Sequence, residues 1–313
     1  MRISHINPIV QACLLFVVAA VILSSCESKG SKPAAQDIVK TEEAWEIRTS
    51  RNLKDNLTYA VENKGKLNDT LFFQHINLAN TIYQDNQYQL IWSIKGENNR
   101  IAESLFSFIS NARLYGLFPS DYDFTRLEGM RSLMKSDTLA QKDAALWARQ
   151  DIMFTNAFFS LVRDLKLGRL PNDSTTLRKD SLLTDSFYIA QLQSAIHSRQ
   201  VNEVLHGLEP KHAGYDSLKA YLPRFLDSAR FRPYTYLTWP YKDSLAFYRA
   251  LNERLYQERL LDTLRENPDT ATIATALRKY QAIKKIKVSG KPSEGLVNYL
   301  NMTDLERFKV IAI

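Results

Sequence analysis

Apolar side chains recur at helical spacing along most of the chain, and the strongest stripe lies near its middle. Its members are separated by alternating steps of four and three residues, which places them on one face of an α-helix. Gly168 can adopt a positive φ, and Pro171 cannot continue a helix. The pattern therefore predicts a central helix that begins near Thr138 and ends at Gly168. Its apolar stripe comprises Trp147, Asp151, Phe154, Phe158, Leu161 and Leu165.

A carboxylate, Asp151, stands within this apolar stripe. Burying a bare carboxylate is costly, so we expect Asp151 to have a partner, either a donor from another helix or a position near the helix start. Phe158 and Leu161 lie in the middle of the stripe and are expected to be buried. Arg163 falls on the opposite face and is expected to be exposed.

Shorter stripes predict further helices before and after the central one. A stripe runs from Phe72 through Ile76 and Ala79 to Tyr83, and residues 87–92 are expected to form an extended segment or a turn that buries Trp92. The other predicted helices cover 45–60, 101–115 (closed by Gly116), 127–134, 186–197, 201–208, 215–225 and 247–255. Residues 231–241 are rich in aromatic residues and proline, and we expect a packed irregular segment there. The fold class is therefore mainly α.

Composition limits the classes of function. The chain has 313 residues, 24% charged residues and a net charge of +7, and it has no zinc-finger spacing or basic block with interleaved aromatics. Binding to nucleic acid is therefore not expected. His206, Glu209 and His212 are the nearest approach to a metal cluster, but their spacing fits no standard zinc arrangement. No metal or cofactor is predicted.

The N-terminus has the features of a secreted, lipidated protein. Arg2 precedes an apolar run at 12–23, which is short for a membrane-spanning helix and suits a signal peptide. The run ends at Leu23-Ser-Ser-Cys26, which resembles a bacterial lipobox with Cys26 as the lipidated residue. This resemblance implies a membrane anchor in the bacterial cell envelope, at the outer membrane facing the periplasm. Residues 27–40 are small and polar and read as a flexible tether.

Three stretches resemble the scaffold domain of large murein L,D-transpeptidases. The first is Asn86 to Trp92, and the second is Leu105 to Tyr122, with its "G-L-x-P-x-D-Y" turn. The third is Asp151 to Pro171, similar to "D…T-x-A…D-L…G-R…P", and Leu208 to Leu218 resembles a further piece, "L-x-P…Y-x-x-L". Within the third stretch, a structural ion pair between Asp164 and Arg169 is expected.

The region after Asp269 resembles the small helical peptidoglycan-binding module. Leu277, Tyr280, Gln281, Gly290, Leu300 and Asn301 match its pattern. The resemblance makes Tyr280, Gln281 and Asn301 candidate glycan contacts. Ser289, Ser293 and Leu296 depart from the residues that the pattern expects.

The named transpeptidases use a cysteine nucleophile beside a histidine, in an "S-H-G-C" type stretch. This sequence contains no such stretch, and its only cysteines are Cys13 in the signal region and Cys26. No catalytic residue is therefore assigned, and the chain is expected to lack transpeptidase activity of its own.

The expected organisation is a signal peptide (1–25), a tether (26–44), a multi-helix scaffold-like domain (45–267), a small three-helix module (268–303) and a truncated linker (304–313). Three interpretations remain open. The protein is an envelope lipoprotein whose non-catalytic scaffold takes part in peptidoglycan binding or remodelling, a truncated L,D-transpeptidase whose catalytic domain lies beyond residue 313, or a purely structural lipoprotein. The sequence does not fix the oligomeric state.

Overall fold

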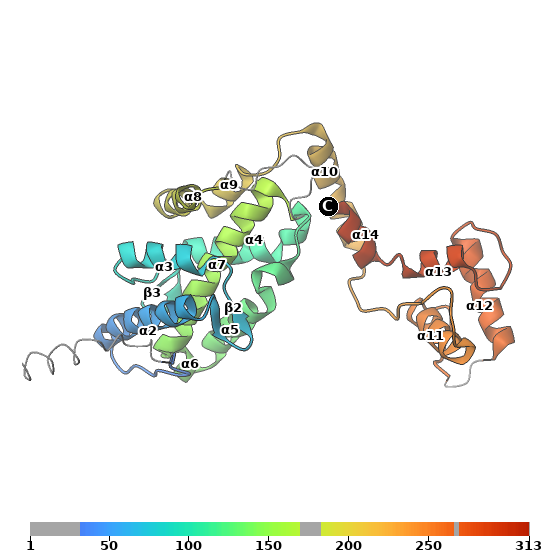
Figure 1. Ribbon diagram of the computed structural model, residues 1–313, viewed down its shortest axis with the longest axis horizontal. Helices are drawn as coiled ribbons and strands as arrows, with labels where there is room; N and C mark the ends of the chain where they lie inside the picture. Colours follow the sequence, from blue (N-terminus) through green and yellow to red (C-terminus); the bar gives the residue numbers. More distant parts are fainter. Residues whose placement is uncertain (1–31, 170–182, 266–268, 313) are drawn as a thin grey trace, which may run out of the picture. The chain divides into compact units, whose positions relative to one another are not determined.

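The computed structural model describes residues 32–169, 183–265 and 269–312, which include thirteen α-helices and two small two-stranded sheets. The mainly α fold class is confirmed. The chain forms two compact units (Figure 1). The first comprises residues 1–107, 122–163 and 181–207, and the second comprises residues 108–121, 164–180 and 208–313. No helix in the described part of the chain is both long enough and apolar enough to cross a membrane.

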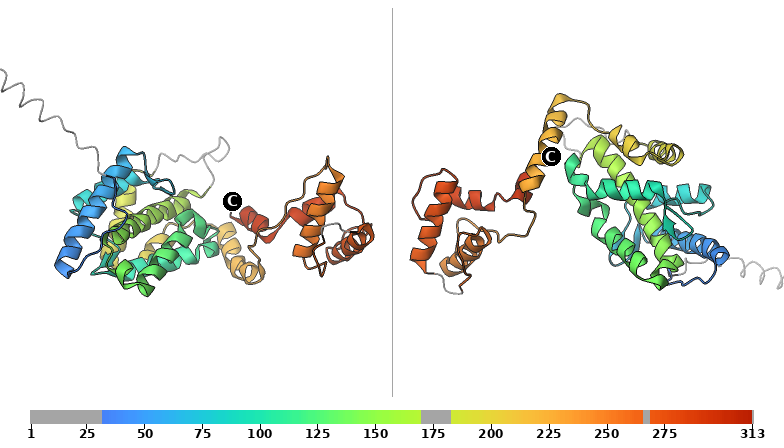
Figure 2. Two further views of the ribbon diagram at one scale, coloured as in Figure 1. Left: turned by 90° about the horizontal axis from the view of Figure 1, so that it is seen from below. Right: turned by 180° about the vertical axis from the view of Figure 1, so that it is seen from behind.

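The first unit is built around the helix α7, with α3 and α5 beside it (Figure 1, Figure 2). Its strands pair antiparallel as β1 with β2 and β3 with β4. In chain order the elements are α2 (Glu42–Glu62), β1 (Lys66–Asn68), β2 (Leu71–Phe72), α3 (Ile76–Asp85), β3 (Ser93–Ile94), β4 (Glu97–Asn98), α4 (Arg100–Ser110), α5 (Phe124–Ser136), α6 (Thr138–Gln141), α7 (Ala144–Leu167), α8 (Asp185–Ser198) and α9 (Val201–His206). Helix α4 belongs to this unit only as far as Ser107, and α7 only as far as Arg163.

The second unit contains the ends of α4 and α7 and the chain from residue 208 onward. Residues 230–240 form an irregular segment with a cis Trp239–Pro240 peptide bond, as the aromatic and proline-rich composition predicted. The regular elements that follow α4 are η1 (Ala112–Tyr115), η2 (Pro119–Tyr122), α10 (Ala213–Ser228), α11 (Ser244–Gln257), α12 (Thr270–Ile283), α13 (Glu294–Asn301) and α14 (Asp304–Ile311).

Helix α7 ends as the sequence predicted, with Gly168 at φ +82° directly after Leu167. All six residues of its apolar stripe are buried. Its start was placed too early, because Thr138 begins the separate short helix α6. Asp143 then opens α7, since its side chain accepts hydrogen bonds from the backbone N–H of Ala145 and Leu146 at 3.0 and 3.3 Å.

Two exposures differ from the sequence-based expectation. Arg163 is half-buried rather than exposed, because the opposite face of α7 is also covered and Phe159 and Val162 there are buried. Phe72 is 57% exposed and lies in β2, outside α3, whereas its neighbour Phe73 is buried. Alternate residues of an extended segment point to opposite sides, so the helical spacing of Phe72 was coincidental.

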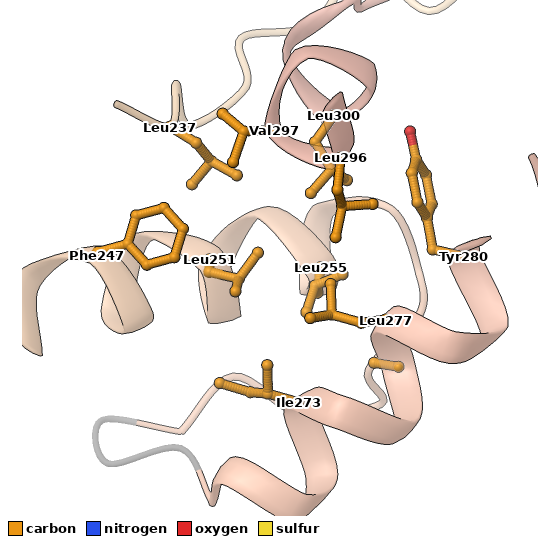
Figure 3. Packing of buried hydrophobic residues seen from close by; sticks show 11 residues of the cluster. Leu237, Phe247, Leu251, Leu255, Ile273, Leu277, Tyr280, Leu296, Val297 and Leu300 are labelled. Atoms are coloured by element: carbon orange, nitrogen blue, oxygen red, sulfur yellow. The ribbon is translucent and has the colours of Figure 1, made fainter. Parts of the chain in front are cut away.

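The C-terminal helices share one apolar core that begins earlier than the predicted boundary at residue 268. Leu251 and Leu255 of α11 pack with Leu277 of α12 and Leu300 of α13 (Figure 3). Residues 268–303 themselves contain only two helices, and the third helix of the module is α11. We name this group of α11, α12 and α13 the C-terminal cluster.

The predicted linker at 304–313 is helical over most of its length. Thr303 caps α14 by accepting the backbone N–H of Glu306 at 3.3 Å. Phe308 is fully buried, and its ring lies 4.8 Å from the ring of Phe118 and 5.5 Å from that of Phe231. Phe308 of this helix therefore packs within the second unit.

Candidate functional site

The buried carboxylate of Asp151 joins α7 to two other segments of the first unit. Its Oδ1 accepts hydrogen bonds from the Tyr83 hydroxyl at 2.5 Å and from the backbone N–H of Ile91 at 2.9 Å, and its Oδ2 accepts the backbone N–H of Trp92 at 2.9 Å. The Trp92 indole N–H donates to Thr155 Oγ1 at 2.8 Å. The donor from another helix that the sequence predicted is Tyr83 of α3.

Burial raises the pKa of Asp151 to about 6, although the hydrogen bonds from Tyr83, Ile91 and Trp92 act to lower it. The desolvation of the charged form therefore outweighs these donors. The Asp151 carboxylate is only 1% exposed and each of its oxygens is occupied within the fold. We interpret Asp151 and Trp92 as structural residues that fix the irregular segment before β3.

The second unit contains a cavity of about 410 Å³. Three of the segments that resemble the transpeptidase scaffold domain meet at this cavity. Gly116 comes from the turn after η1, Gly168 from the end of α7, and Pro210 and Leu218 from the region around α10. These segments lie about 50 residues apart in the chain, so the sequence did not predict that they share one site. The complete lining comprises Tyr115 to Leu117, Asp164 to Arg169, Pro210, His212, Tyr215, Leu218, Lys219, Leu222, Ile311 and Ala312.

A buried glutamate organises one wall of this cavity. Glu209 Oε2 accepts hydrogen bonds from the Tyr215 hydroxyl at 2.6 Å and from Lys219 Nζ at 2.5 Å. The Lys219 ammonium also lies 4.9 Å from the centre of the Tyr115 ring. Burial, together with the hydrogen bond to Glu209, raises the pKa of Tyr215 far above its usual value, so its hydroxyl stays protonated. His212 caps α10 by accepting the Tyr215 backbone N–H at 3.1 Å.

The other basic residue of the cavity has a different partner from the one that the sequence suggested. Arg169 Nη2 lies 2.6 Å from Asp121 Oδ2, and its guanidinium stacks 4.3 Å from the centre of the Phe118 ring. The ion pair that the structure shows for Arg169 is thus with Asp121, whereas the sequence suggested Asp164. Asp164 is inside α7, whereas the left-handed turn at Gly168 directs Arg169 toward η2. Asp164 is buried and lines the cavity.

Gly116 has both a left-handed backbone and a close neighbour. Its φ is +71°, a region that favours glycine, and a Cβ there would lie 3.6 Å from the Ala312 Cα. Residues from two distant parts of the chain therefore approach each other at this edge of the cavity.

Comparison with known protein families identifies the region that carries these features. Residues 77–222 match the family model of the scaffold domain. This match is consistent with the resemblance to the scaffold part of L,D-transpeptidases. No curated protein matches the chain. The scaffold domain contains Asp151 with all of its partners and every cavity-lining residue except Ile311 and Ala312.

The candidate glycan contacts lie after the scaffold domain, in the C-terminal cluster. Gln281 is 2% exposed, and its Oε1 accepts the backbone N–H groups of Ser289 and Gly290, each at 2.9 Å. Asn301 forms two hydrogen bonds with the backbone of Leu237, at 2.8 and 3.0 Å.

The Tyr280 hydroxyl donates to the backbone carbonyl of Tyr299 at 3.1 Å, and burial raises the pKa of Tyr280 to about 12. These side chains are therefore occupied in holding the C-terminal cluster together. The three departures from the module pattern are also structural. Ser289 bonds to Gln281, Ser293 caps α13, and Leu296 belongs to the apolar core.

The remaining site predictions concern Cys26 and the residues Glu209 and His212. Cys26 lies outside the described residues, so its lipidation stays a prediction. Glu209 and His212, which the sequence suggests only as weak candidates for metal ligands, instead bond to Tyr215 and Lys219. The spacing of three and four residues between 212, 215 and 219 is the signal that could have indicated a shared helical face.

Proposed function

We propose that this protein is an envelope lipoprotein whose scaffold domain binds peptidoglycan without catalysing its crosslinking. The match of residues 77–222 to the scaffold domain carries the proposal. Its support is the cavity at which Gly116, Gly168 and Leu218 meet, since a shared site gives these separate segments a common role.

The chemistry of the cavity suits an anionic peptide. Leu218, which is 49% exposed, supplies apolar surface, and the side chains of Lys219 and Arg169, which pair with Glu209 and Asp121, remain 35% and 29% exposed. Peptidoglycan stem peptides combine small apolar side chains with carboxylates. Exposed apolar groups beside cationic groups can bind both features.

Crosslinking would require an acyl-enzyme, and therefore an activated nucleophile. The sequence has only Cys13 and Cys26, and lipidation would convert Cys26 to a thioether. Residues 27–313 are therefore expected to leave disaccharide-tetrapeptide substrates unchanged. A crosslinked dimer seen by mass spectrometry, and persisting after thiol blocking, would contradict a purely binding role.

Sedimentation with purified sacculi tests the binding itself. Residues 27–313 contain every described element, and we expect them to sediment with sacculi. Leu218→Ser should reduce the sedimented fraction, because Leu218 lines the cavity and is 49% exposed. Leu133→Ser is the matched control, since Leu133 is 46% exposed and lies in α5, away from the lining. Equal sedimentation of the two variants would exclude the cavity as the binding site.

The anchor is tested separately in cells. Cys26→Ala should release the protein from the membrane fraction or leave an uncleaved form, because it removes the acylated atom. Incorporation of labelled fatty acid into Cys26→Ala would contradict lipidation at this residue.

A further inference from the structure

The end of α12 and the loop between α12 and α13 carry a concentration of positive charge. Between Asp269 and Glu294 the chain contains no acidic residue. In the same interval it contains six basic residues: Arg278, Lys279, Lys284, Lys285, Lys287 and Lys291. Among the described residues, none of these six forms an ion pair. Lys284 lies 5.5 Å from the centre of the Tyr280 ring, and the charges of the other five are available to an external partner.

Apolar side chains are interleaved with the lysines and point outward. Ile283 is 60% exposed and Val288 is 54% exposed, while Lys285, Lys287 and Lys291 are exposed beside them. Ile286, between them in sequence, packs instead against the core of the C-terminal cluster. The loop at 283–291 thus presents both aliphatic and cationic groups to its surroundings.

This loop is held in a defined shape. Gln281 Oε1 accepts the two backbone N–H groups of Ser289 and Gly290, and Gln281 Nε2 donates to Ser289 Oγ at 3.1 Å. Gly290 has φ +69°, and a Cβ there would lie 2.9 Å from the Arg278 side chain. A fixed backbone reduces the entropy that the loop would lose on binding.

We propose that the loop at 283–291 is a docking surface for an anionic phospholipid membrane. Basic residues near such a surface are attracted to its negative potential, and exposed aliphatic side chains insert at the boundary between headgroups and acyl chains. A soluble polyanion would use the lysines but would gain nothing from Ile283 and Val288. The combination therefore favours a lipid surface over a wall polymer or a nucleic acid. The proposal goes beyond peptidoglycan binding and does not depend on it.

Cosedimentation with lipid vesicles tests the proposal. Residues 27–313 should bind vesicles of phosphatidylcholine with phosphatidylglycerol, and should bind weakly to vesicles of phosphatidylcholine alone. Lys287→Ala combined with Lys291→Ala should lower the partition coefficient about 30-fold, because each basic residue near an anionic surface contributes roughly fivefold. Added salt should weaken the binding of the unmodified chain, because it screens exposed charges.

The matched control removes two lysines elsewhere. Lys135 and Lys211 are exposed, and neither forms an ion pair among the described residues. Lys135→Ala combined with Lys211→Ala changes the net charge by the same amount and should leave most of the binding intact. An equal loss for the two double variants would overturn the proposal, because net charge rather than the loop would then explain binding.

A third variant separates a membrane from a plain polyanion. Ile283→Ser combined with Val288→Ser keeps every charge and should weaken vesicle binding about tenfold, since the aliphatic groups no longer insert. Unchanged binding by this variant would overturn the assignment to a lipid surface. Failure to bind either kind of vesicle would also overturn it, and sedimentation with sacculi would remain a separate result. Circular dichroism of each variant confirms that its helices are retained.

Discussion

Asp151 in the first unit and Gln281 in the C-terminal cluster perform the same task with different chemistry. Each extends from a helix and accepts two consecutive backbone N–H groups of an irregular segment. Asp151 is charged when ionised, and burial raises its pKa. Gln281 is neutral and has no such desolvation cost. The comparison shows that a buried side chain can fix a loop with or without charge, and that only the charged version makes the stability of the fold depend on pH.

Among the substitutions considered, one in the packing around Asp151 is expected to cause the largest loss of stability. Phe158 is fully buried in α7, and its ring lies 6.0 Å from the ring of Trp92. Phe158→Ala should reduce the free energy of unfolding by about 3–5 kcal/mol, because it leaves a cavity beside the network. Urea denaturation measures this change. Lys166→Ala is the control, since Lys166 is exposed on the same helix; equal losses would show that the buried face is misassigned.

The role of the Asp151 carboxylate is tested by replacing one of its two acceptor oxygens with an amide NH₂. Asp151→Asn should reduce the free energy of unfolding by about 2–4 kcal/mol at neutral pH, because an amide NH₂ would face the N–H groups that the carboxylate accepts. Asp85→Asn changes an exposed carboxylate at the end of α3 and should have little effect. A smaller loss for Asp151→Asn than for Asp85→Asn would show that the carboxylate is not a support.

The dependence of stability on pH should distinguish the first unit from the C-terminal cluster. Burial lowers the pKa of His75 to about 4, and its ring lies among Phe159 and Tyr188. The unfolded chain binds this proton near pH 6.5, so the contribution of His75 to stability is present above pH 6.5 and is lost as the pH falls toward 4. Asp151 acts in the opposite sense, because its raised pKa removes stability as the pH rises from about 4 to 6.

The effect of His75 is therefore measured as a difference between two proteins. The stability of the unmodified chain minus that of His75→Phe should rise by roughly 2–3 kcal/mol between pH 4 and 6.5, then stay constant. Gln281 does not titrate, so Gln281→Ala should show no such trend. A flat difference for His75→Phe would mean that folding does not lower the pKa of the imidazole.

Removing the neutral side chain of Gln281 should cause the smallest loss of stability. Gln281→Ala should reduce the free energy of unfolding by about 1–2 kcal/mol, because it leaves the N–H groups of Ser289 and Gly290 without their acceptor close to the surface, where water can replace part of it. Thermal denaturation measures the loss. Lys279→Ala, at an exposed position on the same helix, is the control. A loss as large as that of Asp151→Asn would remove the distinction between the two supports.

The sequence predicted those features that depend on short-range chemistry. Gly168 ends α7 because its positive φ is a local property, and the burial of the α7 stripe follows from periodicity alone. The start of α3 was not predictable in this way, because Phe72 has helical spacing but lies in a hairpin. The predicted exposure of Arg163 was also wrong, since its burial depends on which other helices cover α7.

The candidate site was less accessible to sequence reasoning than the fold. The end of the central helix suggested Asp164 as the partner of Arg169, whereas the structure pairs Arg169 with Asp121, which tertiary structure brings there. The family pattern made Gln281 a candidate glycan contact, and the structure shows its side chain accepting two backbone N–H groups of the loop. Residue type alone does not distinguish an amide that contacts a ligand from one that supports a loop.

The support given by Gln281 has an evolutionary consequence. Because this side chain holds the loop backbone from the helix, outward residues such as Lys287 and Val288 contribute little to folding. Substitutions at such surface positions usually change stability by less than about 0.5 kcal/mol. The loop can therefore gain or lose charge over generations while the module still folds, so its affinity for a partner can be selected independently of its stability.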